Sequence, residues 1–228
     1  MERFGPLYCE TPETITGLFP VEPWNAISSG VIVLFGIASL ILVVQRSPRA
    51  WELYAACALL ILNGVGSILW HGLRTRWALS LDVLPALAFV LLISFVWAWR
   101  VAPLWQAAAV GAALLLSPIV VRLLDLGSRW PLRFGVMALV IVAMALWLIV
   151  RSASASRSAA LTGGAALLSA VAALTFRSID AQACESVGMG SHFLWHIFLS
   201  AAAFLCVVTV VTLDGKRRVD APAAAPAE

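Results

Sequence analysis

Long apolar runs separated by short polar stretches recur along nearly the whole chain. A helix needs about 20 apolar residues to cross the roughly 30 Å of hydrocarbon in a bilayer. With Gly, Pro and Arg taken as breaks between runs, the pattern predicts seven membrane-spanning helices, at residues 26–44, 52–71, 79–99, 103–122, 132–150, 159–176 and 192–213. We therefore expect an all-α fold, an integral membrane bundle of seven transmembrane helices.

Composition supports a bilayer as the surrounding medium. Hydrophobic residues make up 62% of the 228 residues and charged residues only 12%, whereas about a quarter of a soluble domain is charged. The formal net charge of +3 is spread over loops and the C-terminal tail, without a basic stripe interleaved with aromatic residues. A nucleic-acid partner is therefore excluded, and the lipid bilayer is the expected partner.

The pattern divides the chain into three parts. Residues 1–25 form an acidic N-terminal segment that lacks the basic start of a signal peptide, so we expect it to be retained. Residues 26–213 form the single membrane domain. Residues 214–228, which end in APAAAPAE, are polar and proline-rich, and we expect a disordered tail there.

Basic residues indicate the orientation. The cluster Lys216-Arg217-Arg218 directly follows the last predicted span, which favours a cytoplasmic C-terminus and an N-terminus outside. Abundant Ala and Arg with a single Lys are typical of a GC-rich bacterial genome, so we expect the bacterial plasma membrane. The sequence does not specify an oligomeric state.

Polar side chains within the spans gather at one membrane face. Each ionisable group in a span costs about 2.5 kcal/mol or more on insertion scales, so such groups mark function. Ser67 and His71 end the second span, Asp82 begins the third, and His192 and His196 begin the last. Because successive spans alternate in direction, all five side chains are expected at one depth.

The two histidines in HFLWH point to the same side of a helix, the geometry by which a His-x-x-x-His pair holds zinc. His71 is the third candidate ligand, and three neutral imidazoles leave a zinc position for a water whose pKa falls to about 7. This arrangement predicts a hydrolase. Asp82 would accept the proton of the water or orient an imidazole, and Ser67 would hydrogen-bond a substrate carbonyl; the residues do not divide these roles.

Four sequence blocks then resemble a known family: YCE at 8–10, EPWNAISS at 22–29, GSILWH at 66–71 and SHFLWH at 191–196. Their order and spacing are similar to those of the alkaline ceramidases, seven-helix membrane hydrolases related to the adiponectin-type receptors. The resemblance implies zinc on His71, His192 and His196, with Ser67 and Asp82 as the catalytic pair. It also implies that ceramide or a similar N-acyl lipid is the substrate, cleaved to a fatty acid and a long-chain amine.

The resemblance raises the question of calcium, because eukaryotic ceramidases have a calcium site in this N-terminal region. Glu10 and Glu22 remain here, but Leu7 and Pro12 stand where oxygen-donating side chains would be expected. Calcium binds through about six to eight oxygens. Calcium at Glu10 and Glu22 and a solvated acidic segment therefore both stay open.

Four further polar residues have structural interpretations. Cys9 and Cys184 fall on the same face and are expected to pair as a disulfide if that face is extracellular or periplasmic; free thiols are the alternative. Asn25 is expected to cap the first helix. Asp180, in the loop before the last span, either braces the assembly at this face or is a solvated loop acid, and the solvated acid is the preferred interpretation.

Two other functions compete with hydrolysis. A lipid receptor or sensor on the same scaffold would keep the metal but lack turnover. A transporter would use the histidines as a proton relay, since polar groups in a membrane often mark transport paths. Zinc content and fatty-acid release distinguish the three hypotheses.

Overall fold

A computed structural model describes residues 5–15, 17–123 and 130–220, and within these ranges the chain is helical and contains no strand. The helices are α1 (Pro23–Arg46), α2 (Trp51–Leu73), α3 (Arg76–Val101), α4 (Leu104–Leu123), α5 (Trp130–Ala155), α6 (Arg157–Ser178), the short α7 (Asp180–Ala183) and α8 (His192–Asp220).

In the described residues, six helices are long and apolar enough to cross a membrane: α1, α2, α3, α4, α6 and α8. The corresponding stretch of α5, Leu139–Ala155, is apolar but shorter. The all-α membrane bundle is therefore confirmed, while the count of seven spans stays a prediction.

The outer surface of α1 shows how the bundle meets lipid. Ile27, Leu34 and Ile41 recur every seventh residue and are 68%, 65% and 52% exposed. A stripe of large apolar side chains directed outward along a helix suits hydrocarbon rather than water. The opposite side of α1 packs on α2 and α8.

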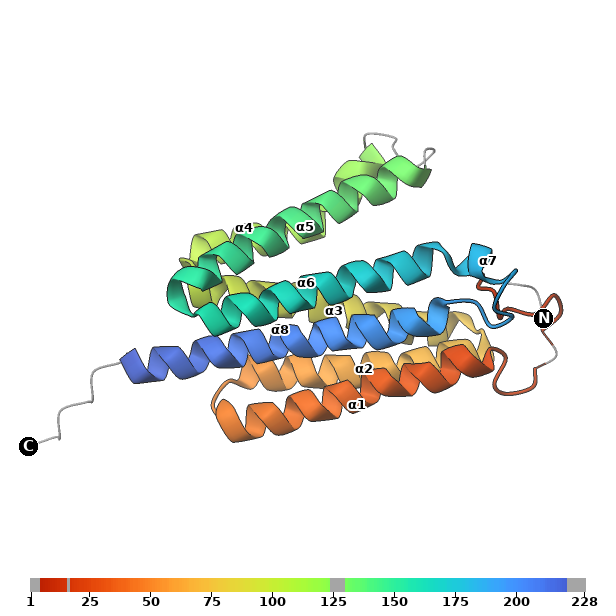
Figure 1. Cartoon of the computed structure of the whole chain (residues 1–228), viewed down its shortest axis with the longest axis horizontal. Coiled ribbons are helices and arrows are strands. Elements are labelled where there is room, and N and C mark those ends of the chain that lie inside the picture. Colours follow the sequence, from red (N-terminus) through yellow and green to blue (C-terminus); the bar gives the residue numbers. More distant parts are fainter. Residues whose placement is uncertain (1–4, 16, 124–129, 221–228) are drawn as a thin grey trace, which may run out of the picture.

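Helix α8 is central to the packing, because it contacts α1, α6 and α3. Figure 1 shows α1, α2, α6 and α8 running roughly parallel in space, while α4 and α5 form a pair that diverges from them toward the end where α7 lies. We call the end that holds the N-terminal segment and α7 the site end. Residues 5–15, at the start of the chain, lie there beside the beginning of α8 (Figure 1).

Two helix boundaries differ from the prediction. Helix α1 starts at Pro23, not at residue 26, because proline fits the first turn, where its missing N–H is not needed. Helix α8 runs to Asp220, beyond the predicted end at 213. One reason is that Asp214, just past the predicted end, accepts a hydrogen bond from Arg100 of α3 and so fixes this part of the helix in the bundle. Of the predicted tail, residues 221–228 lie outside the described part of the chain.

A close contact between α2 and α3 brings their polar residues together. A Cβ atom added at Gly66 would collide with the backbone of Leu81 and Asp82. Only glycine therefore allows α3 to approach α2 at this level, and this approach places Ser67 next to Asp82.

Candidate metal centre

Three imidazoles from two helices meet at the site end. His71 lies in the last turn of α2, and His192 and His196 lie in the first two turns of α8. All three are buried, and one ligand nitrogen from each lies within 4.8 Å of the others. Their ring centroids are 4.7 to 5.3 Å apart. Two helices far apart in the sequence thus bring three imidazole nitrogens, each able to bind a metal, close together.

Hydrogen bonds to the other ring nitrogen orient two of these imidazoles. Glu22 Oε2 lies 2.5 Å from His71 Nδ1, and a carboxylate accepts the proton of this nitrogen. Ser28 Oγ donates to the Asn25 carbonyl, 3.1 Å away, so it accepts from His196 Nδ1 at 2.8 Å. Both assignments leave Nε2 with its lone pair, as a metal ligand requires.

His192 is oriented by ring stacking. The ring of Tyr8 stacks on His192 with centroids 4.0 Å apart, and the Arg177 guanidinium lies 4.5 Å from the centre of the same tyrosine ring. Burial raises the pKa of Tyr8, so the phenol stays neutral. His192 Nδ1 is buried and has no hydrogen-bond partner among the described residues. A buried nitrogen of this kind fits an imidazole that belongs to a metal site.

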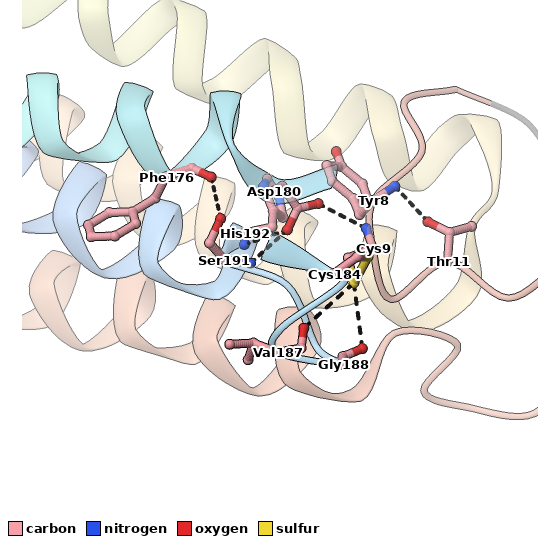
Figure 2. Close-up of a disulfide and its surroundings, with 10 residues drawn as sticks. All are labelled: Tyr8, Cys9, Thr11, Phe176, Asp180, Cys184, Val187, Gly188, Ser191 and His192. Atoms are coloured by element: carbon pink, nitrogen blue, oxygen red, sulfur yellow. Dashed lines mark hydrogen bonds between the residues drawn. A yellow bond between two sulfur atoms is a disulfide. The ribbon is translucent and has the colours of Figure 1, made fainter. Parts of the chain in front are cut away.

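The carboxylate of Asp180 fixes the start of α8, as Figure 2 shows. It accepts the backbone N–H groups of Ser191 and His192 at 2.8 and 2.9 Å, and that of Cys9 at 2.9 Å. Asp180 is buried, so its interpretation as a solvated acid is wrong. The first N–H groups of a helix need acceptors, and Asp180, the first residue of α7, supplies one to α8 only once the chain has folded.

A disulfide joins the N-terminal segment to the loop after α7. Cys9 and Cys184 are bonded, with Cα atoms 5.5 Å apart, and the Cys9 Sγ atom also lies 3.5 Å from the Gly188 carbonyl (Figure 2). Cys57 and Cys206 are free. The disulfide holds Tyr8, the neighbour of Cys9, in the position where it stacks on His192.

The second polar group lies on α2 and α3. Asp82 is hydrogen-bonded by Ser67, and Asn63 Nδ2 donates to its Oδ1 at 3.0 Å and to its backbone carbonyl at 2.7 Å. The Oγ atom of Ser29, in α1, lies 3.0 Å from Ser67 Oγ and 3.5 Å from His196 Nδ1. A chain of polar contacts therefore links Asp82 to the imidazoles.

The two acids considered for calcium have defined partners. Glu10 accepts the backbone N–H groups of Trp24 and Asn25 at 2.7 and 2.9 Å, so Glu10 caps α1 and the predicted cap, Asn25, lies inside the helix. Glu22 is buried and accepts from the Thr11 hydroxyl at 2.6 Å. Burial raises the pKa of Glu22, against the opposing effects of this hydrogen bond and of the Arg74 charge.

The donor set fits a metal ion of the zinc type. Three imidazoles and no thiolate form one of the usual ligand sets of catalytic zinc, with room for a further ligand. Two of the rings are oriented through Nδ1, and partners of this kind are typical of zinc-binding histidines. The residues present therefore fit zinc, without a fourth protein ligand among the described residues.

Sequence reasoning missed Tyr8, Asn63, Arg74 and Arg177 as members of this region. Only Tyr8 had a signal, because it opens the YCE block. The other three lie near helix ends or inside an apolar run, where an isolated polar residue has many interpretations.

Comparison with known proteins gives a consistent result. No curated protein matches the chain closely enough to be compared with it. The sequence profile of the family described as Ceramidase matches residues 8–224, which include the N-terminal segment from Tyr8 onward, all three histidines and Asp82. A match over nearly the whole chain confirms the resemblance in the four sequence blocks, and the chain belongs to the ceramidase family.

Proposed function

We propose that the chain is a zinc-dependent membrane amidohydrolase that cleaves ceramide or a similar N-acyl lipid to a fatty acid and a long-chain amine. The observation that carries this proposal is the meeting of His71, His192 and His196 within 4.8 Å in a member of the ceramidase family. Family membership supports hydrolysis of a lipid amide, and the imidazole cluster supports metal assistance.

His71, His192 and His196 would hold the zinc ion. Zinc bound there supplies an activated water at neutral pH and polarises the amide carbonyl. Glu22 and Ser28 hold His71 and His196 through Nδ1 and so keep both rings turned toward the common point. Tyr8 covers His192 and excludes water from one side of the cluster.

Asp82 and Ser67 would carry the proton and orient the substrate. The Asp82 carboxylate takes a proton from the attacking water and returns it to the amide nitrogen, so that the C–N bond breaks to give a neutral amine and a fatty acid. Asn63 fixes the Asp82 Oδ1 atom during this transfer. Once Asp82 has taken up the proton it no longer needs Ser67 as a donor, and the Ser67 hydroxyl donates to the carbonyl oxygen as negative charge develops on it.

The disulfide supports a location for the reaction. Disulfides persist in oxidising compartments and are rare in the cytosol, so the site end belongs outside the cytoplasm. The C-terminal Lys216-Arg217-Arg218 cluster then lies on the cytoplasmic side, as the positive-inside rule expects. Lipid would reach the site from the outer part of the bilayer.

Zinc content and product release test the proposal together. Wild-type chain purified in detergent without chelators should contain about one zinc, as expected for a three-histidine catalytic site, and should release fatty acid from ceramide. His196→Ala should lose most of the zinc and the activity. The matched control is Cys206→Ala, which removes another potential zinc ligand of α8 outside the cluster and should retain both.

The other outcomes identify the competing functions. Bound zinc without fatty-acid release from any of a panel of N-acyl lipids would favour the sensor. Metal-free wild-type protein would favour the transporter and would contradict the proposed zinc site.

A further inference from the structure

Hydrogen-bond donors already occupy the carboxylates where calcium would be expected. Both oxygens of Glu10 accept the first backbone N–H groups of α1. A calcium ion would have to share the carboxylate with these donors, which stay bound because the first N–H groups of a helix have no acceptor within it.

Glu22 is even less available to calcium than Glu10. Its Oε1 accepts from Thr11 Oγ1 at 2.6 Å and lies 3.2 Å from Arg74 Nη1. Its Oε2 faces His71 Nδ1 at 2.5 Å, with Asn25 Nδ2 at 3.5 Å. The side chain is fully buried, and in the described part of the chain the hydrogen-bond and ion-pair partners of its oxygens named above are all donors. Calcium needs a shell of acceptor oxygens, so these residues do not fit it.

Arg74 occupies the position in which a cation would be expected. It caps α2 in the left-handed conformation, with φ of 53°, three residues after His71. The residue is 4% exposed, its Nη2 donates to the Pro6 carbonyl at 2.7 Å, and its guanidinium carbon lies 4.0 Å from the centre of the Trp70 ring. One buried guanidinium thus joins the N-terminal segment, Glu22 and the end of α2.

The charges explain why these partners exclude calcium. The fixed positive charge of Arg74 balances Glu22, and a divalent ion placed beside it would be repelled strongly in a buried environment. Displacing Arg74 would cost free energy, because its guanidinium would also lose its hydrogen bond to the Pro6 carbonyl and its contact with the Trp70 ring.

We propose that Arg74 is the internal cation of the N-terminal segment: it holds Glu22 against His71 and makes the metal centre independent of calcium. Arg74 is a positioning residue, since it acts on His71 only through Glu22. The effect on zinc rests on the proposed function, whereas the effect on calcium does not.

The calcium experiment uses the wild-type chain in detergent. Its thermal unfolding midpoint is followed while calcium is raised to about 1 mM and above, which covers the Kd range of roughly 10⁻⁴–10⁻³ M of weak extracellular calcium modules. We expect no shift in the midpoint and no calcium in the purified protein by elemental analysis. A saturable rise in the midpoint, or bound calcium, would overturn the proposal even if zinc binding and hydrolysis were both established.

The second experiment measures zinc affinity by competition with a chromophoric chelator. Arg74→Gln should weaken zinc binding by about tenfold, the lower limit for loss of a partner that orients a ligand. Arg74→Lys keeps the positive charge and should retain most of the affinity, and the control Arg49→Gln, an exposed loop arginine, should match wild type. Rescue by lysine separates a charge effect from loss of packing.

The variants also keep the two proposals apart. Equal zinc affinity in wild type and Arg74→Gln would overturn the role of Arg74 and leave the zinc site intact. If Arg74→Gln does not fold, the comparison of Arg74→Lys with wild type decides: a loss of zinc affinity as large as that in a Ser28→Ala chain would contradict a role carried by charge.

Discussion

The bundle buries ionic side chains at both ends, but the two groups differ in what they leave unsatisfied. At the end opposite the site, Arg100 of α3 donates to Glu52 of α2 and to Asp214 of α8. At the site end, Glu22 and Arg74 also pair, yet beside them three imidazoles bring nitrogens of one kind together.

The difference separates a group of paired opposite charges from a group that could hold a metal ion. The cation at Arg100 lies between two acids, so opposite charges within the chain attract each other. Converging imidazole nitrogens have no attraction for one another, and an ion that accepts their lone pairs could hold them together. The comparison predicts that substitutions around Arg100 mainly alter stability, whereas substitutions at the site end mainly alter metal binding or turnover.

Asp82→Asn should give the largest effect at the site end. The amide cannot take up a proton, so kcat should fall about 10²–10⁴-fold while zinc content stays near that of wild type. Rates of fatty-acid release and elemental analysis of the same sample check this. Near-normal kcat would show that Asp82 does not move the proton.

Arg100→Met should give the largest effect at the opposite end. Removing the cation leaves Glu52 and Asp214 as buried acids without it, and breaking a buried ion pair costs about 3–5 kcal/mol. The free energy of unfolding should fall by this order, measured by thermal or denaturant unfolding in detergent. Arg49→Met is the control, and loss of zinc from folded Arg100→Met would argue against separate roles.

Gly66→Ala tests the contact that brings Ser67 to Asp82. The added methyl collides with the backbone at Leu81 and Asp82, and overpacking costs about 1–3 kcal/mol. Turnover should fall with stability, because α3 moves away from Ser67. Gly111→Ala has open space around the new methyl and should leave activity unchanged; equal behaviour of the two variants would contradict the role of Gly66.

Ser28→Ala should give the smallest effect. Without its hydroxyl, His196 Nδ1 loses its nearest partner, and zinc affinity should fall by about tenfold with stability nearly unchanged. Ser39→Ala, which removes a buried hydroxyl of α1 without a partner in the described residues, is the matched control. Unchanged zinc affinity in Ser28→Ala would mean that the serine does not orient the ring.

Most of the helices could be predicted, because apolar runs of bilayer length are a strong local signal. The ends were less accurate: Pro23 was taken as a break although it starts α1, and α8 runs past its apolar part to Asp220. The family resemblance was confirmed over residues 8–224, because the four sequence blocks are short but specific.

The site could be predicted only where one spacing rule applied. The pair His192 and His196 follows from helix periodicity, whereas the roles of Asp180 and Arg74 depend on contacts between segments far apart in the chain. An acid in a loop and an arginine after a helix look alike in sequence whether they are solvated or buried. The roles of the cluster in catalysis stay predictions.

The Asp180 carboxylate also imposes an order in time on the biosynthesis of the protein. It connects Cys9 with His192, and Cys9 and Asp180 are 171 positions apart, a stretch that a ribosome takes many seconds to translate at about 5–20 residues per second. Until the last helix has entered the bilayer, a nascent chain displays only His71 and cannot assemble the cluster. The cluster of three imidazoles is therefore completed only at the end of insertion, in a finished polypeptide.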